Sequence, residues 1–297
     1  MQICRLPPPL KPGDWLNVIA PSGALRERAS FEKGIQIWEA RGYQLKLAPG
    51  YDARWGYLAG TDADRRHKLR QALQDPDCRG LLCLRGGYGG ARLLENWQWN
   101  LSEPKWLIGF SDITSLLWSL ALEGVAGVHA PLLTTLYVEP DWSVQRLFDW
   151  VEGRDIAPLQ GEGWGGGQAR GILLPANLTV ATHLLGTSVQ PDLTGAILAF
   201  EDVSEAPYRI DRMLTQWRMM GAFDGVKGIA LGRFSQCDPT PGIPSFTTPE
   251  VLRERLSDLE IPVVAELPFG HEGVNAALPV GVPVELDGDQ GSLSILN

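Results

Sequence analysis

Short apolar runs alternate with amphipathic segments along the first half of the chain. Residues 80–84 form a continuous apolar run, as expected of a buried parallel strand. Phe31, Ile35 and Trp38 recur at helical spacing. This alternation predicts an α/β domain whose parallel sheet carries helices on both faces. The predicted strands are 15–20, 42–47, 80–84, 107–110 and an extended piece that starts at 127; the predicted helices are 31–41, 61–73 and 113–122.

The pattern changes between residues 151 and 170. Segment 161–167 is too rich in glycine to pack a core and predicts a linker or an exposed loop. Alternating elements then resume, and the chain ends in a pattern typical of a β-hairpin around residues 287–289. We therefore predict an N-terminal domain of residues 1–150, a linker of residues 151–170 and a smaller C-terminal α/β domain of residues 171–297. The helices predicted there are 176–185, 210–220 and 249–259, and the strands are 196–200, 228–231 and 262–265.

Composition and charge exclude several classes of protein. The 297 residues are 44% hydrophobic and 21% charged, which is typical of a globular chain with enough apolar material for a core. The net charge of -9 and the lack of a basic stripe argue against a nucleic-acid binder. No apolar run is long enough for a membrane span or a signal peptide, so we expect a cytoplasmic protein that does not enter the membrane. A short basic cluster, interpreted as a solvated helix face, comprises Arg65, Arg66, Lys68 and Arg70.

The four cysteines suggest neither a disulfide framework nor a metal site. Cys4, Cys78, Cys83 and Cys237 form no CxxC pair, and no spacing of histidine and cysteine suits zinc. We expect reduced thiols in a reducing compartment and neither a metal nor another cofactor.

Ser111 is the first candidate for chemistry. It follows a predicted strand directly and precedes a predicted helix, so it lies on a sharp turn that exposes its hydroxyl, as in a nucleophile elbow. The helix N-terminus favours negative charge, and the backbone amide of Asp112 can donate to an oxyanion. The usual elbow has glycine two residues after the serine, whereas this chain has Ile113. A simple helix cap is therefore the alternative interpretation of Ser111.

A serine hydroxyl needs a base, and histidine is the usual one. His271 lies in a glycine-flanked loop, where the backbone can approach a ligand, and we favour it over His129, which follows a predicted strand. Glu201 and Asp202 directly follow the predicted strand 196–200, at the sheet edge where α/β proteins hold their ligands. Glu201 can therefore orient the histidine. The alternatives are a structural histidine and a pair of helix-capping acids.

A glycine-rich loop at residues 85–90 follows the predicted strand 80–84. It reads Arg-Gly-Gly-Tyr-Gly-Gly and could cradle a phosphate. It lacks the Lys-Ser/Thr pair of a P-loop and the glycine spacing of a dinucleotide fold. Its amides can equally supply an oxyanion donor.

Four of these segments, in this order, resemble the LD-carboxypeptidases (muramoyltetrapeptide carboxypeptidases), a family of serine peptidases that includes the microcin C immunity peptidases. The resemblance runs from Gly13 to Gly281. It departs from the family at residues 175–178, Pro-Ala-Asn-Leu, where the family usually has Gly-Gly-Asn-Leu. The four segments are Arg-Gly-Gly-Tyr-Gly at 85–89, Gly-Phe-Ser-Asp-Ile-Thr at 109–114, Glu-Asp-Val-Ser-Glu-Ala-Pro-Tyr-Arg-Ile-Asp-Arg at 201–212, and Gly-His at 270–271 with Asn275.

The resemblance implies a catalytic triad of Ser111 as nucleophile, His271 as base and Glu201 as orienting acid. It implies an oxyanion hole formed by the backbone amide of Asp112 and by that of Gly86 or Gly87. The implied fold is an N-terminal flavodoxin-like domain and a C-terminal α/β domain, with the active site between them. A homodimer is a further expectation from the family.

The implied reaction is removal of the terminal D-alanine from a murein tetrapeptide in cell-wall recycling, without a metal ion. An exopeptidase must also bind the free carboxylate of its peptide substrate, for which arginine is the natural partner. Arg85 and Arg233 are the candidates. Two alternatives remain open: an immunity-type peptidase that cleaves a peptidyl or aminoacyl nucleotide, and a non-catalytic protein that binds peptides or nucleotides through the glycine loop.

Overall fold

The computed structural model describes residues 2–296, which form two compact units. The N-terminal unit comprises Cys4–Ile156 together with Ala276–Val280. The C-terminal unit comprises mainly Ala157–Asn275 and the segment that starts at Gly281. Part of the interval 151–170, predicted as a linker, carries short strands of the C-terminal unit, because its backbone pairs with that unit's sheet: β6 (Leu159–Gln160) and β7 (Glu162–Gly163).

The N-terminal unit is built on a six-stranded sheet in the order β12-β5-β4-β3-β1-β2. Strands β1 to β5 are parallel to their neighbours, and their order is the flavodoxin-like one, so this part of the predicted fold is confirmed. Strand β12 pairs antiparallel with β5 at the edge. The strands are β1 (Trp15–Ile19), β2 (Gln44–Leu47), β3 (Cys78–Cys83), β4 (Trp106–Gly109), β5 (Val128–His129) and β12 (Leu278–Pro279).

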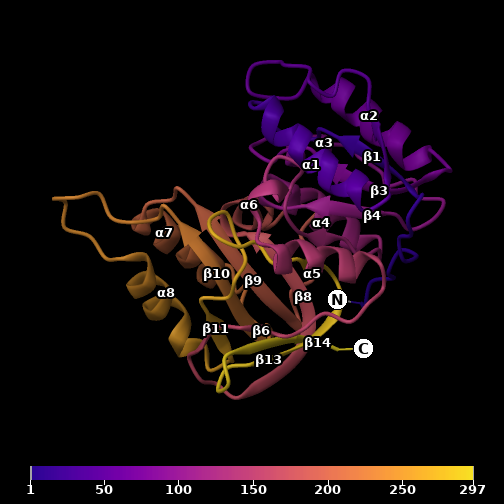
Figure 1. Cartoon of the computed structure of the whole chain (residues 1–297). Helices are drawn as coiled ribbons and strands as arrows, with labels where there is room; N and C mark the ends of the chain where they lie inside the picture. The colour runs from indigo at the N-terminus through magenta and orange to yellow at the C-terminus, as the bar shows by residue number, and fades with distance from the viewer. Residues whose placement is uncertain (1, 297) are drawn as a thin grey trace. The chain divides into compact units, whose positions relative to one another are not determined.

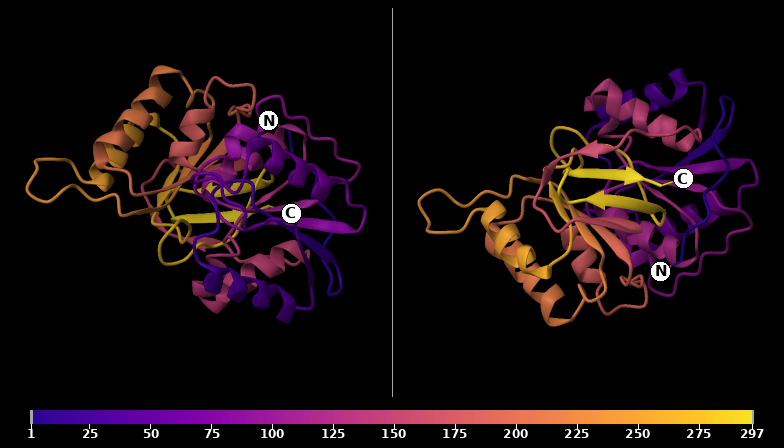
Figure 2. Two further views of the ribbon diagram at one scale, coloured as in Figure 1. Left: turned by 90° about the horizontal axis from the view of Figure 1, so that it is seen from above. Right: turned by 90° about the horizontal axis from the view of Figure 1, so that it is seen from below.

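Helices cover both faces of this sheet. Helices α1 (Arg28–Ala40) and α5 (Asp141–Val151) lie beside each other on one face, and α2 (Asp62–Gln74) lies on the other (Figure 2). The rings of Trp38 and Phe148 join α1 to α5, with centroids 4.9 Å apart. Helix α2 contacts α3 (Gly90–Leu93), which contacts α4 (Thr114–Leu122). The sequence offers Thr61 or Asp62 as the cap of α2, and the structure has Thr61, which forms a capping box with Asp64.

The C-terminal unit is built on an eight-stranded sheet in the order β6-β14-β13-β8-β9-β10-β11-β7. Strands β8 to β11 are parallel, and β13 and β14 form the predicted hairpin (Figure 1). Its helices are α6 (Leu178–Leu184), α7 (Pro207–Met219) and α8 (Thr248–Leu256), and its remaining strands are β8 (Gln168–Asn177), β9 (Ala196–Val203), β10 (Gly228–Ser235), β11 (Val263–Ala265), β13 (Pro283–Asp287) and β14 (Ser292–Ile295).

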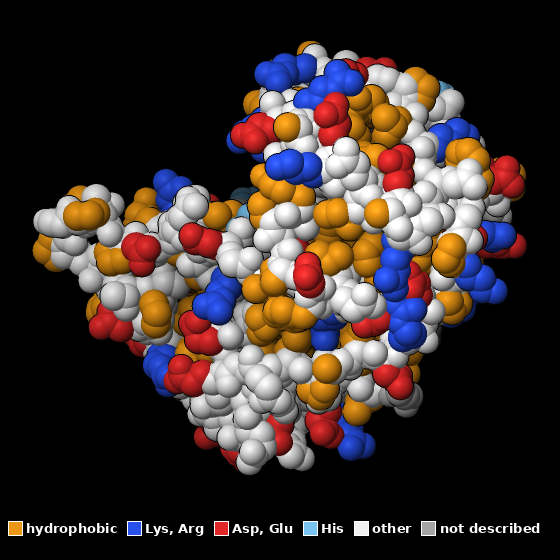
Figure 3. Space-filling model, in the orientation of Figure 1, with side chains coloured by type: hydrophobic (Ala, Val, Ile, Leu, Met, Phe, Trp, Pro, Cys, Tyr) orange, Lys and Arg blue, Asp and Glu red, His pale blue; other side chains and the backbone are white. Residues whose placement is uncertain are grey.

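One glycine shows how tightly this second unit is packed. Strand β13 contacts β10, and a Cβ atom on Gly228 of β10 would lie 2.8 Å from the side chain of Leu286 on β13. The segment between β10 and α8 extends away from the sheet and carries hydrophobic side chains at its tip (Figure 3). Its exposed apolar residues are Ile243 and Phe246.

Three further features bear on the expected chemistry. Among residues 2–296, no helix is both long and apolar enough to cross a bilayer. Within that same range, no group of His, Cys, Asp and Glu side chains has the arrangement of a metal site. All four cysteines are buried free thiols, as expected for reduced cysteines.

Candidate active site

Ser111 lies at the carboxyl end of β4, on the turn into α4. Its φ is +64°, a left-handed conformation that non-glycine residues seldom adopt. A single 3₁₀ turn, Ser111–Ile113, leads into α4. Such backbone strain costs of order 1–3 kcal/mol and gathers at functional sites. The strained turn favours the elbow interpretation of Ser111 over a simple helix cap, because a capping residue usually has an extended backbone.

The loops after three adjacent strands meet beside Ser111. In the sheet, β4 neighbours β3 and β3 neighbours β1, so their carboxyl ends share one edge. The amide of Gly23, after β1, donates to the carbonyl of Gly86, after β3, at 3.0 Å. A Cβ atom on Gly86 would lie 3.0 Å from Ser111 Cβ and 3.1 Å from Ser111 Oγ. The glycine loop therefore borders the serine hydroxyl directly, and a larger residue at position 86 would crowd it.

Arg65 corrects one prediction from the sequence. The sequence pattern groups it with Arg66, Lys68 and Arg70 on a solvated helix face, yet Arg65 is only 1% exposed. Its guanidinium pairs with Asp62 and donates to the carbonyl oxygens of Pro21 and Gly89. The composition of α2 could not show this, because both backbone partners lie in loops far from α2 in sequence.

The two arginines proposed to bind a carboxylate differ in their surroundings. Arg85 is half-buried. Its guanidinium packs against Gly87 of the glycine loop and against Gly23, which follows β1. Burial lowers the pKa of Arg85, and the charge of Arg26 adds to this effect. No ion pair between described residues involves Arg85, whereas the exposed Arg233 pairs with Glu266 at 3.1 Å. Arg85 is therefore the better placed of the two to receive an anionic group.

The half-buried His271 pairs with Glu201 in the C-terminal unit. Nδ1 of His271 lies 2.6 Å from Oε2 of Glu201, which is fully buried at the end of β9. Burial lowers the pKa of His271, but the charge of Glu201 and the hydrogen bond to it outweigh this effect, with help from Asp202. The net pKa of His271 is raised above its usual value. The contact fixes the ring and leaves Nε2 as the nitrogen that can take a proton from a nucleophile.

Asn177 and Asp202 complete this buried polar group. Nδ2 of Asn177 donates to Glu201 at 3.3 Å and to Asp202 at 3.0 Å. Asp202 also accepts from the amide and the hydroxyl of Thr179, each at 2.8 Å. Burial and the charge of Glu201 raise the pKa of Asp202 to about 6. The sequence showed Asp202 beside Glu201 but gave no sign that Asn177, the cap of α6, joins the two acids.

A hydrogen bond from a backbone amide to a side chain holds the loop that carries His271. The amide of Gly270 donates to Oδ1 of Asn275 at 3.1 Å, which closes the loop. Gly270 has a φ of +134°, and a Cβ atom there would lie 3.0 Å from Cβ of Arg233. Both the conformation and the space require glycine at position 270.

Gly270→Ala is expected to destabilise this loop. The new methyl group meets the backbone and Cβ of Arg233 and occupies an unfavourable φ, which together cost roughly 1–3 kcal/mol of unfolding free energy. Urea denaturation measures the change. Gly273→Ala is the matched control: it has a φ of +79° in the same loop but open space around its Cβ, so it should cost less. Equal losses would show that the contact with Arg233 contributes nothing.

The other histidine weighed as a base has a structural setting. His129 ends β5, is fully buried and packs edge-on against the ring of Phe110, with centroids 5.6 Å apart. A histidine buried in the sheet is not accessible to a substrate that binds at the surface. The structure thus favours His271, at the tip of a loop, over His129.

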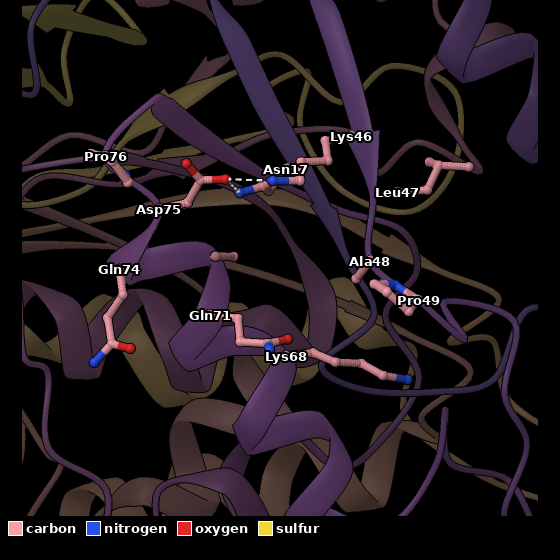
Figure 4. Close-up of a pocket in the computed structure, with 11 residues that line it drawn as sticks. Asn17, Lys46, Leu47, Ala48, Pro49, Lys68, Gln71, Gln74, Asp75 and Pro76 are labelled. Carbon is pink, nitrogen blue, oxygen red and sulfur yellow. Dashed lines mark hydrogen bonds and ion pairs between the residues drawn. The ribbon is translucent and has the colours of Figure 1, made fainter.

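A pocket of about 500 Å³ lies elsewhere in the N-terminal unit, between β2 and α2 (Figure 4). Lys46 spans it to Asp75 at 2.9 Å, and Asn17 also donates to Asp75 (Figure 4). Lys68 also lines the pocket, and its amine donates to the Gly50 carbonyl at 2.7 Å. None of the site residues predicted from the sequence lines it.

The predicted residues therefore fall into two groups. The N-terminal unit brings Ser111 and Asp112 together with the glycine loop, and the C-terminal unit brings His271 together with Glu201. Arg85 belongs to the first group, and Arg233 lies beside the loop of the second.

Family models match both units. The model of the LD-carboxypeptidase N-terminal domain matches residues 16–130, and that of the LD-carboxypeptidase C-terminal domain matches residues 170–286. A protein of Synechocystis sp., provisionally named a carboxypeptidase, is 59% identical over 98% of this chain and 97% of its own length. This chain belongs to the LD-carboxypeptidase family. The murein tetrapeptide carboxypeptidase of Pseudomonas aeruginosa is 32% identical over 92% of this chain and 93% of its own.

Solved structures of the LD-carboxypeptidase family share the fold. The muramoyltetrapeptide carboxypeptidase from Oxalobacter formigenes is 28% identical, covers 94% of this chain and 97% of its own, and has a TM-score of 0.84. The microcin C7 self-immunity protein in complex with aspartyl sulfamoyl adenosine has a TM-score of 0.87 at 22% identity, over 99% of this chain and 98% of its own. The second likeness concerns the fold alone. Both structural matches agree with the α/β fold predicted from the sequence.

Proposed function

We propose that this member of the LD-carboxypeptidase family is a serine peptidase that cleaves the amide bond between an L-centre and a terminal D-residue. Its substrate would be a murein tetrapeptide, from which it releases D-alanine. The observation that carries the proposal is the 2.6 Å contact between Nδ1 of His271 and Oε2 of the buried Glu201. The strained turn at Ser111 supports it, and so do the relatives named murein tetrapeptide and muramoyltetrapeptide carboxypeptidase.

The proposed reaction has two steps. In the first, Nε2 of His271 takes the proton of Ser111 as Oγ bonds to the carbonyl carbon, and then gives that proton to the departing amine of D-alanine. In the second, water loses a proton to Nε2 and attacks the acyl-serine ester, which frees the shortened peptide and restores the hydroxyl. Glu201 stabilises the imidazolium that forms in each step. The backbone amide of Asp112 and that of Gly86 or Gly87 donate to the oxyanion.

Arg85 is proposed to bind the terminal carboxylate of the peptide. Charged hydrogen bonds of this kind contribute about 1.5–3 kcal/mol. Arg85→Gln is therefore expected to lower kcat/KM for tetrapeptide roughly 10- to 100-fold, mostly through KM. Arg233→Gln is the comparison and should have a smaller effect, because that side chain is exposed and already paired with Glu266.

A substrate with an amidated C-terminus separates binding of the carboxylate from other effects. In the wild-type enzyme, kcat/KM should be much lower for the amidated peptide than for the peptide with a free carboxylate. In Arg85→Gln, the two peptides should give similar values of kcat/KM. A further loss of the same size in the variant would mean that Arg85 does not contact the carboxylate.

The proposal as a whole is tested with a defined tetrapeptide that ends in D-alanine. The purified protein is incubated with this peptide, with the same peptide ending in L-alanine, and with an aminoacyl sulfamoyl adenosine. Release of free amino acid from the first substrate alone is the expected result. Cleavage of the nucleotide alone would instead identify an immunity-type peptidase, and inertness toward all three would overturn the proposed reaction.

A further inference from the structure

Asp112 offers more than its backbone amide to the nucleophile turn. Asp112 is only 3% exposed, although its side chain is a carboxylate. Oδ2 of Asp112 accepts a hydrogen bond of 2.6 Å from the amide of Gly90, at the far end of the glycine loop. Burial raises the pKa of Asp112, while the Ser22 hydroxyl, two loop amides and the charge of Arg65 act in the opposite direction. A buried acid that satisfies loop amides is suited to holding that loop in place.

The glycine loop lies against the nucleophile turn at both of its ends. Gly86 borders the hydroxyl of Ser111, as described above. At the other end, a Cβ atom on Gly90 would lie 3.0 Å from Oδ2 and from the carbonyl oxygen of Asp112, and 2.6 Å from Oγ of Ser115. Ser115 in turn donates to the Asp112 carbonyl at 2.8 Å. The glycine backbone of the loop therefore packs directly against the side chains of the turn and the Asp112 carbonyl. A small shift of the loop would change the direction in which its amides point.

Arg65 holds the same loop from its opposite side. Its buried guanidinium donates to the Gly89 carbonyl at 2.8 Å and to the Pro21 carbonyl, and Asp62 balances its charge. A Cβ atom on Gly89 would lie 2.7 Å from the same guanidinium. Consecutive glycines thus use opposite polar groups: Gly89 gives its carbonyl to a buried cation, and Gly90 gives its amide to a buried anion.

We propose that Asp112 and Arg65 are positioning residues that hold the glycine loop against Ser111, so that a loop amide stays aimed at the oxyanion of the intermediate. The inference rests on the proposed function of Ser111. Oxyanion donors act only when they are preorganised, and a misplacement of about 1 Å can cost roughly 100-fold in rate. Neither side chain is assigned contact with the substrate, so their loss should act on the rate of chemistry rather than on substrate binding.

The test uses Asp112→Asn and Arg65→Met in the full chain. Asp112→Asn keeps the backbone amide and the side-chain shape but removes the charge that the Gly90 amide meets. Arg66→Met is the matched control, because Arg66 is the next residue of α2 and donates to the Arg92 and Leu93 carbonyls rather than to the glycine loop. Arg65→Lys tests for rescue, since it restores the cation without the planar fork.

Three quantities are measured for each folded variant: the rate at which a fluorophosphonate labels Ser111, kcat and KM for D-alanine release, and amide exchange in the peptide that spans the glycine loop. Asp112→Asn and Arg65→Met should slow labelling and kcat roughly 10- to 100-fold, with KM within about threefold. Amide exchange in the loop should become faster. Arg66→Met should match wild type in all three, and Arg65→Lys should recover part of the rate.

Two results would overturn the inference. One is labelling and kcat within about twofold of wild type in a folded Asp112→Asn or Arg65→Met protein. The other is unchanged exchange of the loop amides in both variants. Labelling keeps this test separate from the choice of substrate: a wild-type protein that labels at Ser111 but releases no D-alanine contradicts the proposed substrate and leaves the role of Asp112 and Arg65 measurable. If Arg65→Met does not fold, the same two criteria are applied to Asp112→Asn and Arg65→Lys.

Discussion

Ser111→Ala is expected to reduce kcat for D-alanine release by at least roughly 10⁴-fold while the protein keeps its fold. The reaction as proposed has no acyl intermediate without Oγ, and members of a catalytic triad lose most of their joint effect when any one is removed. Alanine removes a single oxygen atom from a partly exposed turn, and its methyl group occupies the place of the serine Cβ. The unfolding free energy should therefore change by less than about 1 kcal/mol.

The measurement is a time course of free D-alanine at high enzyme concentration, beside thermal melts of both proteins. Ser102→Ala, at an exposed position before β4, is the control for serine loss and should retain full activity. Release by Ser111→Ala within about tenfold of wild type would exclude Ser111 as the nucleophile. A folded, inactive variant that still binds tetrapeptide would assign the loss to chemistry.

Glu201→Gln is expected to lower kcat roughly 10³- to 10⁴-fold, as neutral replacements of the triad acid do elsewhere. The amide can hold the His271 ring but cannot stabilise the imidazolium. The pH profile should change as well. Catalysis needs neutral His271, so activity rises with pH through the pKa of the histidine, which Glu201 holds above its usual value. Removing the carboxylate charge lowers this pKa, and the acid limb should move to lower pH.

The profile of kcat/KM between about pH 5 and 9 measures this shift for wild type and variant. Glu254→Gln, an exposed acid on α8, is the control and should leave both the rate and the midpoint in place. An acid limb that stays at the same pH in Glu201→Gln would mean that another group controls it. Asp202, with its pKa raised to about 6, would then be the next candidate.

Local patterns in the sequence were sufficient to predict most of the fold. Strands β3 and β9 were visible because burial on both faces makes them largely apolar. Strand β8, at the centre of the second sheet, was not predicted, because its first half is polar and partly exposed and its last residues were assigned to the following helix. The cap of α2 and the C-terminal hairpin were visible because their signals lie within a few residues. Helix α5 was not predicted, although its residues have a clear apolar face; its packing on Trp38 is a contact across about a hundred residues.

The residues of the site also fall into those that the sequence could indicate and those that it could not. Ser111, Glu201 and His271 could be selected because each follows a strand or a glycine, and the family resemblance gave them roles. The residues that hold them could not be selected, because they are ordinary in sequence. Arg65 has the pattern of a surface arginine, and Asn177 that of a helix cap; only the folded backbone shows that one contacts the Gly89 carbonyl and the other bridges two acids.

The return of Ala276–Val280 to the N-terminal unit has a consequence for dissecting this protein. Residues 278 and 279 pair with the edge of β5, the last of the parallel strands. A fragment cut after residue 156 would leave that flank without its hydrogen-bonding neighbour, and bare strand edges recruit other chains. The gene segment that encodes the N-terminal sheet is thus interrupted: the edge strand of that sheet, Leu278–Pro279, is translated more than a hundred codons after residue 156, just after the histidine loop.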